Sequence, residues 1–142
     1  MKINGSCHCG ALTYEAEIDP DKVGICHCHS CQILSGTSFR TGVHVPIEKF
    51  HLHGGPPRTY TKTGGSGQPR VMVFCGNCGT QIYGIAGGDS ASVISLRVGT
   101  CDQRAELKPR REIFRAEAVN WLGDLGIEES HDLGRRDRAP SD

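Results

Sequence analysis

The sequence predicts a single small domain that is mainly β and contains little helix. Two observations support this. Glycine is frequent, with 19 among 142 residues, and it interrupts the chain at short intervals. Between these breaks, apolar and polar residues alternate as they do in half-buried strands. Hydrophobic residues make up only 37% of the chain, and so lean a core gains from metal crosslinks, because metal-binding free energy adds to folding free energy.

The clearest alternation runs over residues 11–18 (ALTYEAEI), which predicts the first strand. Further strands are expected in six later segments: 39–45, 49–52, 58–62, 71–74, 81–85 and 92–98. Glycine and proline break the pattern at 54–57 and 64–67, where we expect loops.

Helix signals are weak and amount to one turn at 32–34 and another at 117–122. From Glu128 onward the residues are polar and charged and show no periodicity. We therefore expect one domain over residues 1–127 and a frayed, flexible tail over 128–142.

Charge and hydropathy narrow the function classes. The 16 basic and 16 acidic residues give a formal net charge of zero, so we expect no nucleic-acid partner and no anionic membrane surface. The first ten residues (MKINGSCHCG) contain no apolar run, and no later segment is apolar for long enough to cross a bilayer. We therefore expect a cytoplasmic protein, in which clustered cysteines act as metal ligands or catalytic groups before they form disulfides.

Seven of the eight cysteines fall into three tight clusters. They are Cys7 and Cys9, then Cys26, Cys28 and Cys31, then Cys75 and Cys78. A structural zinc is closed by four protein ligands, whereas a catalytic zinc keeps three and one open position. Seven ligands therefore predict one closed site and one open site, and the open site suggests an enzyme.

Glycines help to divide the seven. Cys75 and Cys78 are spaced as in a zinc knuckle, and Gly79 follows them, just as Gly10 follows Cys9. A glycine at this place can adopt positive φ and turn the backbone N–H groups toward the thiolates. We therefore assign four cysteines to the closed site: Cys7, Cys9, Cys75 and Cys78. The remaining triplet, Cys26, Cys28 and Cys31, would form the open site.

Other assignments remain open on spacing alone. The triplet could bind no metal, or serve redox chemistry, or hold a second structural zinc closed by Cys101, His27 or His29. Iron–sulfur ligation is also possible, although the glycine-backed knuckle favours zinc. Because His27 and His29 alternate with ligand cysteines, a tight turn would direct them away from the metal, and we expect them beside the site or exposed.

The motifs that carry a family resemblance stand in a fixed order: GSCHCGALTYE at 5–15, CHCHSC at 26–31 and FCGNCGTQIY at 74–83. This order resembles the glutathione-dependent formaldehyde-activating family, which also includes centromere protein V. The likeness continues through the segment 98–102 and two single residues, Pro109 and Trp121. It covers about residues 3–122.

The resemblance implies a fold of short, coiled antiparallel β-sheets around zinc, related to that of methionine sulfoxide reductase B. It implies two zinc ions per chain, with Cys7, Cys9, Cys75 and Cys78 on the structural ion and Cys26, Cys28 and Cys31 on the catalytic one. The implied activity joins formaldehyde to the glutathione thiol and is classed as a carbon–sulfur lyase from the reverse direction. The expected partners are thus a small thiol and an aldehyde.

Two positions depart from the family pattern. Cys101 stands where relatives usually carry leucine, and Glu112 takes a position that is often histidine. Neither is a ligand position, but both could alter the pocket or its substrate.

Glutathione carries two carboxylates and needs donors. The candidates are Arg40, Arg70 and the loop 64–67, including Ser66, where glycines let backbone N–H groups approach a ligand. The alternative is that these arginines are solvated surface charges and the loop is only a turn.

Two further hypotheses stand beside the lyase. The chain could be another zinc enzyme on the same scaffold, with a different small thiol or electrophile. It could also be a non-catalytic zinc-stabilised binding module, in which a fourth protein ligand, most obviously Cys101, closes the triplet.

Overall fold

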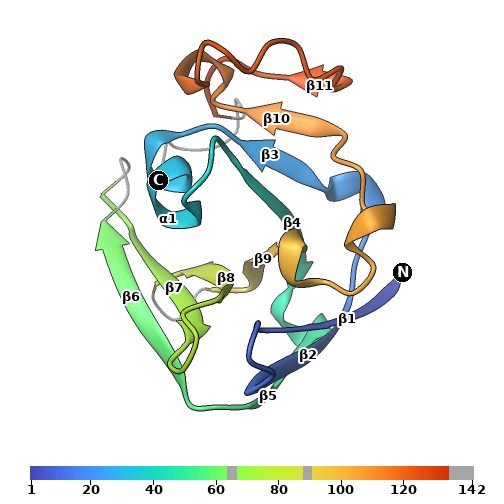
Figure 1. Cartoon of the computed structure of the whole chain (residues 1–142), viewed down its shortest axis with the longest axis vertical. Coiled ribbons are helices and arrows are strands. Elements are labelled where there is room, and N and C mark those ends of the chain that lie inside the picture. Colours follow the sequence, from blue (N-terminus) through green and yellow to red (C-terminus); the bar gives the residue numbers. More distant parts are fainter. Residues whose placement is uncertain (64–66, 88–90, 135–142) are drawn as a thin grey trace.

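A computed structural model describes residues 1–63, 67–87 and 91–134 of the chain. Within these residues the strands form two sheets, and one short α-helix, α1 (His29–Ser35), lies beside the larger of them (Figure 1). The prediction of a mainly β fold is confirmed.

The smaller sheet has three strands in the order β1-β2-β5: β1 (Lys2–Ser6), β2 (Leu12–Glu17) and β5 (Phe50–Gly54). Both pairings are antiparallel. Side chains of β2 alternate strictly between buried and exposed, as its sequence predicts, and this places Leu12 and Tyr14 in the core.

The larger sheet has eight strands in the order β11-β10-β3-β4-β9-β8-β7-β6. The strands span Gly24–Cys26 (β3), Arg40–Pro46 (β4), Pro57–Thr63 (β6), Pro69–Cys75 (β7), Gln81–Ala86 (β8), Val93–Arg97 (β9), Arg111–Ile113 (β10) and Glu129–Ser130 (β11). Strand β10 runs parallel to both of its neighbours, so this sheet is mixed rather than purely antiparallel. The strands from β3 to β6 bend around the middle of the molecule, and α1 lies inside the bend (Figure 1).

The two sheets share one hydrophobic core. Branched side chains from β4 and β9 pack with residues of β2 and β5 in this cluster: Val43, Val45, Ile94, Leu96, Leu12, Tyr14 and Phe50. Because neighbouring residues of a strand point to opposite faces, residues adjacent to these core positions must face the other side of the large sheet. That second face carries Cys26.

All seven expected strand segments form strands, with bounds shifted by one or two residues. Four further strands, β1, β3, β10 and β11, were not expected. Helix α1 has seven residues rather than one turn. Within the turn expected at 117–122, the Leu122 N–H donates to the Val119 carbonyl, and a 3-10 turn precedes it at Arg115–Glu117.

The segment expected as a frayed tail from Glu128 includes residues that hydrogen-bond to the large sheet. Strand β11 pairs with β10, and the backbone N–H groups of Phe114 and Arg115 donate to the carbonyls of Leu133 and His131. Residues 135–142 lie outside the described part of the chain, so the rest of the tail stays a prediction.

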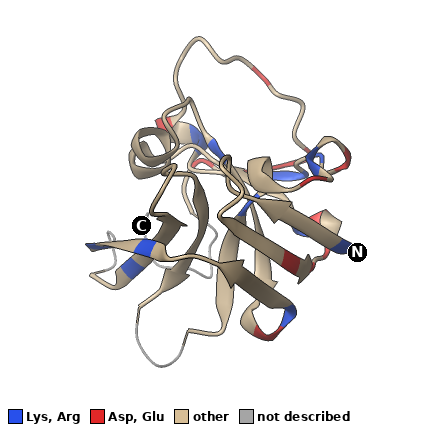
Figure 2. Cartoon of the chain, turned by 60° about the horizontal axis from the view of Figure 1, so that its bottom comes forward, with Lys and Arg blue, Asp and Glu red and all other residues tan. Residues whose placement is uncertain are grey.

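In the view of Figure 2 acidic and basic residues are interspersed along the ribbon, in keeping with the zero net charge. None of the helices in the described residues is both long and apolar enough to cross a bilayer.

Candidate functional site

The structure brings Cys7, Cys9, Cys75 and Cys78 together. Their Sγ atoms all lie within 4.8 Å of one another. The Sγ atom of Cys9 is 3.6 Å from that of Cys7 and 3.7 Å from that of Cys75. Thiolates on a tetrahedral zinc with 2.3 Å bonds lie about 3.8 Å apart, so this four-sulfur cluster fits such an ion closely.

Backbone N–H groups turn toward these sulfurs as the glycine positions predict. Gly10 and Gly79 both adopt positive φ, at 81° and 80°. The N–H of Leu12 donates to Cys7 Sγ at 3.3 Å, and that of Cys78 donates to Cys75 Sγ at 3.5 Å. Such bonds stabilise thiolates and orient them for a metal.

Two thiols of this cluster are set up for deprotonation. The pKa of Cys78 is lowered to about 5, chiefly by its hydrogen bond with the Thr80 hydroxyl, 3.2 Å away. The pKa of Cys9 is also lowered, first by the Asn77 side chain and then by the backbone of Ala11. At these two sulfurs a cation therefore competes with protons less than at an ordinary thiol.

The triplet Cys26, Cys28 and Cys31 forms a second cluster, also with every Sγ within 4.8 Å of the others. Cys26 ends β3, Cys28 caps the N-terminus of α1, and Cys31 lies in its first turn. The Cys28 sulfur accepts the backbone N–H of Cys31 at 3.4 Å and lies 3.0 Å from the Cys31 sulfur. The three sulfurs converge because a strand end and a helix start meet at the same place.

All three triplet thiols are buried, with Cys28 and Cys31 only 2% and 1% exposed. The pKa of Cys26 is raised far above its ordinary value by its hydrogen bonds with Cys28 and Cys31 and by burial. Buried thiols that stay protonated carry no charge. A soft divalent cation, in contrast, would bind all three as thiolate ligands. The donor set therefore fits zinc.

Within residues 1–63, 67–87 and 91–134, no fourth Cys, His, Asp or Glu joins the triplet. Cys101 is fully buried elsewhere in the core, where its sulfur accepts the Tyr14 hydroxyl at 3.1 Å. His29 has a side chain that is 74% exposed, and it pairs with Glu117 at 3.6 Å. The hypothesis that Cys101, His27 or His29 closes the triplet is therefore wrong for this structure.

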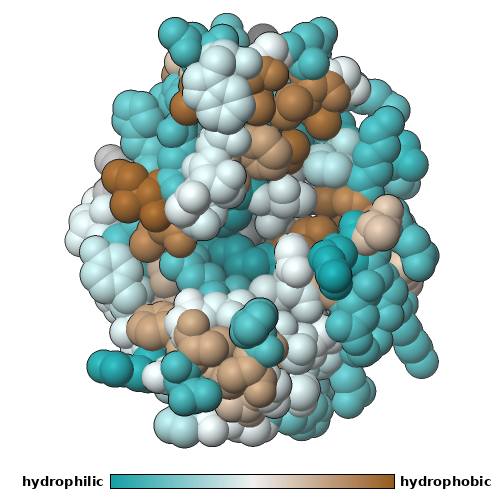
Figure 3. All heavy atoms as spheres, in the orientation of Figure 1, coloured by the Kyte–Doolittle hydropathy of each residue, from teal (hydrophilic) through white to brown (hydrophobic). Residues whose placement is uncertain are grey.

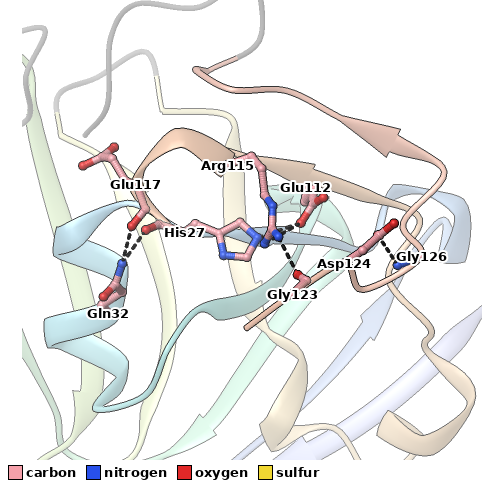
Figure 4. Close-up of polar contacts among 8 residues, drawn as sticks. All are labelled: His27, Gln32, Glu112, Arg115, Glu117, Gly123, Asp124 and Gly126. Carbon is pink, nitrogen blue, oxygen red and sulfur yellow. Dashed lines mark hydrogen bonds and ion pairs between the residues drawn. The ribbon is translucent and has the colours of Figure 1, made fainter. Parts of the chain in front are cut away.

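His27 is wholly buried between the two ligand positions and points to β10 instead (Figure 4). Its Nε2 lies 2.7 Å from Oε2 of Glu112, which is itself buried, and Arg115 Nη1 lies 4.0 Å from the same oxygen. The backbone N–H of His27 also donates to the Ile113 carbonyl. Glu112, one of the two departures from the family pattern, thus anchors the Cys26–Cys28 segment.

Gln32 provides a second anchor for the same segment (Figure 4). Its side-chain Nε2 donates to the carbonyl of His27 at 2.8 Å and to that of Glu117 at 3.0 Å. One amide of α1 therefore ties the triplet loop to the chain that follows β10.

Arginines share the sheet face of the triplet. Arg40 stands opposite Cys26 in the β3–β4 pairing, and Gly42, two residues further, stands opposite Arg97 in β9. Partners in register point to the same face, so Cys26, Arg40 and Arg97 belong to one side of the sheet. Arg70 precedes Met72 by two residues in β7 and lies on that side as well.

Arg97 is buried, with 6% exposure. Its Nη1 donates to the carbonyl and hydroxyl of Ser95, and its Nη2 lies 3.2 Å from the sulfur of Met72. The pKa of Arg97 is lowered to about 9, first by burial and then by Arg40, while Cys31 acts in the opposite direction. In the orientation of Figure 1 the molecule has a recess near its middle, floored by hydrophilic residues (Figure 3).

The model of the family described as "Glutathione-dependent formaldehyde-activating enzyme" matches residues 2–117, which include all seven clustered cysteines. The chain belongs to this family. The order of the cysteine motifs predicted this family, and the match confirms the prediction.

One relative of this chain is an uncharacterized lyase of Schizosaccharomyces pombe, which is 29% identical over 82 residues. The match covers 56% of this chain and 54% of that protein, so it spans about half the length of the relative. Among solved structures, a crystal structure of a Rhodobacter sphaeroides protein has the same fold, with a TM-score of 0.56 and 18% identity. The similarity covers 90% of this chain and 98% of that one.

Outside the two cysteine clusters, a cavity of about 540 Å³ lies against β3 and the segment after β9. Its lining is mostly apolar and includes Ile25, Phe39, Val98 and Leu107. Ile25 and Cys26 are neighbours on one strand and point to opposite faces, so this cavity does not open onto the triplet from the arginine side.

The residues expected to contact glutathione differ in where they lie. Arg40 and Arg70 lie on the triplet face, whereas Ser66, with most of the loop 64–67, lies outside the described residues. Arg97 and Gln32 were not among the residues expected at the site. The alternation in β9 offered a signal for Arg97, since Ser95 and Arg97 fall on the face opposite Ile94 and Leu96.

Proposed function

We propose that the protein is a zinc-dependent carbon–sulfur lyase that joins the glutathione thiol to formaldehyde or a similar small electrophile. Cys26, Cys28 and Cys31 hold the catalytic zinc, and Cys7, Cys9, Cys75 and Cys78 hold the structural zinc. The observation that carries the proposal is a buried three-thiol cluster to which the described residues add no fourth ligand. Membership of the family and the lyase name of the fission yeast relative support the reaction class.

The chemistry follows from the donor set. Zinc held by Cys26, Cys28 and Cys31 would lower the pKa of an incoming thiol, and three thiolate donors would leave the sulfur of that thiol nucleophilic. The sulfur then forms a bond to the aldehyde carbon, the carbonyl electron pair moves to oxygen, and that oxygen takes a proton. The thiol and the aldehyde together become the hydroxymethyl thioether, with no oxidant required.

The chain's own residues bind and orient the reactants. The triplet is held by the two anchors from Glu112 and Gln32, which keeps Cys26 and Cys28 in place without further reorganisation. Arg40 and Arg70, on the triplet face, would bind carboxylates of glutathione, since guanidinium groups recognise carboxylates by paired hydrogen bonds. Ser66 remains a candidate contact.

A second candidate is a zinc enzyme with another small thiol or electrophile, because nothing in the triplet itself selects glutathione. The binding-module hypothesis is weaker, since Cys101, its expected closing ligand, is occupied with Tyr14 in the core.

The test combines metal counting with product detection. We expect two zinc ions per chain in the wild-type protein and one in each of Cys28→Ala and Cys78→Ala. The Cys28→Ala variant should stay folded but fail to speed the formation of hydroxymethylglutathione, followed by NMR exchange between free and bound formaldehyde. One zinc in the wild-type protein would overturn the two-site assignment.

Glutathione binding gives an independent check. A ligand that binds only the folded state raises the melting temperature, so millimolar glutathione should do so for the wild-type protein and not for Cys28→Ala. If glutathione has no effect while another thiol does, the second candidate replaces the first.

A further inference from the structure

Arg97 is a buried cation that forms no ion pair with a carboxylate of the described residues. The ion pairs among the described residues include none to Arg97. Its hydrogen bonds go to neutral groups, the carbonyl and hydroxyl of Ser95 and the thioether of Met72, and its Nε has no hydrogen-bond partner among the described residues. A charge held in this way is costly to bury, so a compensating anion is to be expected nearby.

The triplet cysteines, which share one face of the large sheet with Arg97, can supply this anion once a bound metal converts them to thiolates. Cys31 and Cys26 both favour its charged form, while Arg40 and Arg70 oppose it. The guanidinium of Arg97 extends over Gly84 toward Met72, on the face of the large sheet that also carries Cys26.

The charge of the loaded triplet explains why a cation is needed there. Three thiolates on a divalent ion leave a net charge of −1, and a thiolate as fourth ligand makes it −2, all in a buried place. The four-cysteine site also reaches −2, but two of its ligands, Cys9 and Cys78, are exposed to water. Only the triplet therefore depends on the protein for its counter-charge.

We propose that Arg97 is the counter-charge of the triplet metal centre and that, with Arg40, it makes an anionic thiolate acceptable as the fourth ligand. This rests on the proposed function for the identity of that ligand. Arg97 is thus a positioning and charge-compensating residue rather than one that touches the reacting atoms.

The proposal predicts opposite effects on two quantities. Without metal, replacing Arg97 by a neutral side chain removes a buried charge that lacks an acidic partner, so the metal-free protein should be no less stable. With metal, the same change should weaken zinc at the triplet by about tenfold, the effect of one charge screened over roughly 10 Å of protein. A purely structural arginine would move both quantities in the same direction.

The experiment is chelator competition on protein loaded with two zinc ions, with release followed by a colorimetric zinc indicator. The phase that is absent in Cys28→Ala identifies the triplet, and the four-cysteine site in the same chain is the internal control. Arg97→Met should lose triplet affinity, whereas Arg97→Lys, which keeps the charge, should stay within about threefold of wild type. Met72→Leu perturbs the same packing without removing a charge and should leave both sites unchanged.

Each other outcome overturns the proposal. Equal triplet affinity in Arg97→Met and wild type would remove Arg97 from the metal centre and leave the proposed function standing. A loss of both metals together with lower metal-free stability would mark Arg97 as structural. A wild-type chain that holds only one zinc would overturn the function and this inference together.

Discussion

His27 Nε2 and Glu112 Oε2 lie 2.7 Å apart in the interior, and their side chains are 0% and 5% exposed. The contact joins two segments that are 85 residues apart in the chain. It fixes the residue between Cys26 and Cys28, so the geometry of the triplet depends on a carboxylate in β10.

Removing this carboxylate should be costly. Glu112→Ala leaves a buried imidazole with both ring nitrogens unpaired, because His27 Nδ1 has no partner in the described structure, and should lower the free energy of unfolding by about 2–3 kcal/mol. Glu112→Gln keeps an acceptor and should cost about half as much. Urea denaturation of the two variants, with exposed Glu128→Gln as control, measures this. Equal stability of Glu112→Ala and wild type would contradict the anchoring role.

Gln32 should matter for the triplet without being a ligand. In Gln32→Leu the carbonyls of His27 and Glu117 lose their shared donor, which should cost about 1–2 kcal/mol in urea denaturation. The neighbouring Ile33→Leu, at an 80% exposed position of the same helix, is the matched control. Zinc at the triplet should be released faster in Gln32→Leu only. Unchanged release would show that α1 holds its ligands without this bond.

Metal removal should affect the two sites unequally. The four-cysteine cluster joins Cys7 and Cys9 to Cys75 and Cys78 across a long loop, so its loss should lower the melting temperature strongly, whereas Cys28→Ala should lower it little. Differential scanning fluorimetry of Cys78→Ala and Cys28→Ala compares them. A larger drop in Cys28→Ala would reverse the structural and catalytic roles.

The metal-free protein should show an unusually acidic thiol. Because the pKa of Cys78 is lowered to about 5, its thiolate persists at neutral pH and is lost only as the pH falls through 5. Alkylation of this exposed cysteine by iodoacetamide, followed by mass spectrometry, should therefore have its midpoint near pH 5. In Thr80→Val, which lacks the main hydrogen-bond partner, the midpoint should rise. An unchanged midpoint would exclude Thr80 as the cause.

Local pattern was enough to predict the strands that line the core. The alternation over β2 and around Val43 and Val45 in β4 decides burial within a few residues of sequence, and the structure agrees there. The triplet was equally predictable, because a spacing of two or three residues leaves ligands close together in any fold, whereas the pairing of Cys7 and Cys9 with Cys75 and Cys78 was inferred from the glycines that follow them.

Other features depend on contacts that no local pattern encodes. Strands β3 and β10 have three residues each and contain Gly24 or two charges, so they depend on pairing with each other and with β4 and β11. The partner of Glu112 and the burial of Arg97 likewise arise from segments far apart in sequence. Such sites are found in structure before they can be recognised in sequence.

The strand pairing of β11 has a consequence for how the domain is divided. The family match ends at residue 117, yet residues 129–133 hydrogen-bond to β10 and the turn that follows it. A chain cut at the family boundary would leave one edge of β10 open, next to the carboxylate that holds His27. The segment that holds the triplet in place therefore extends beyond the residues that match the family.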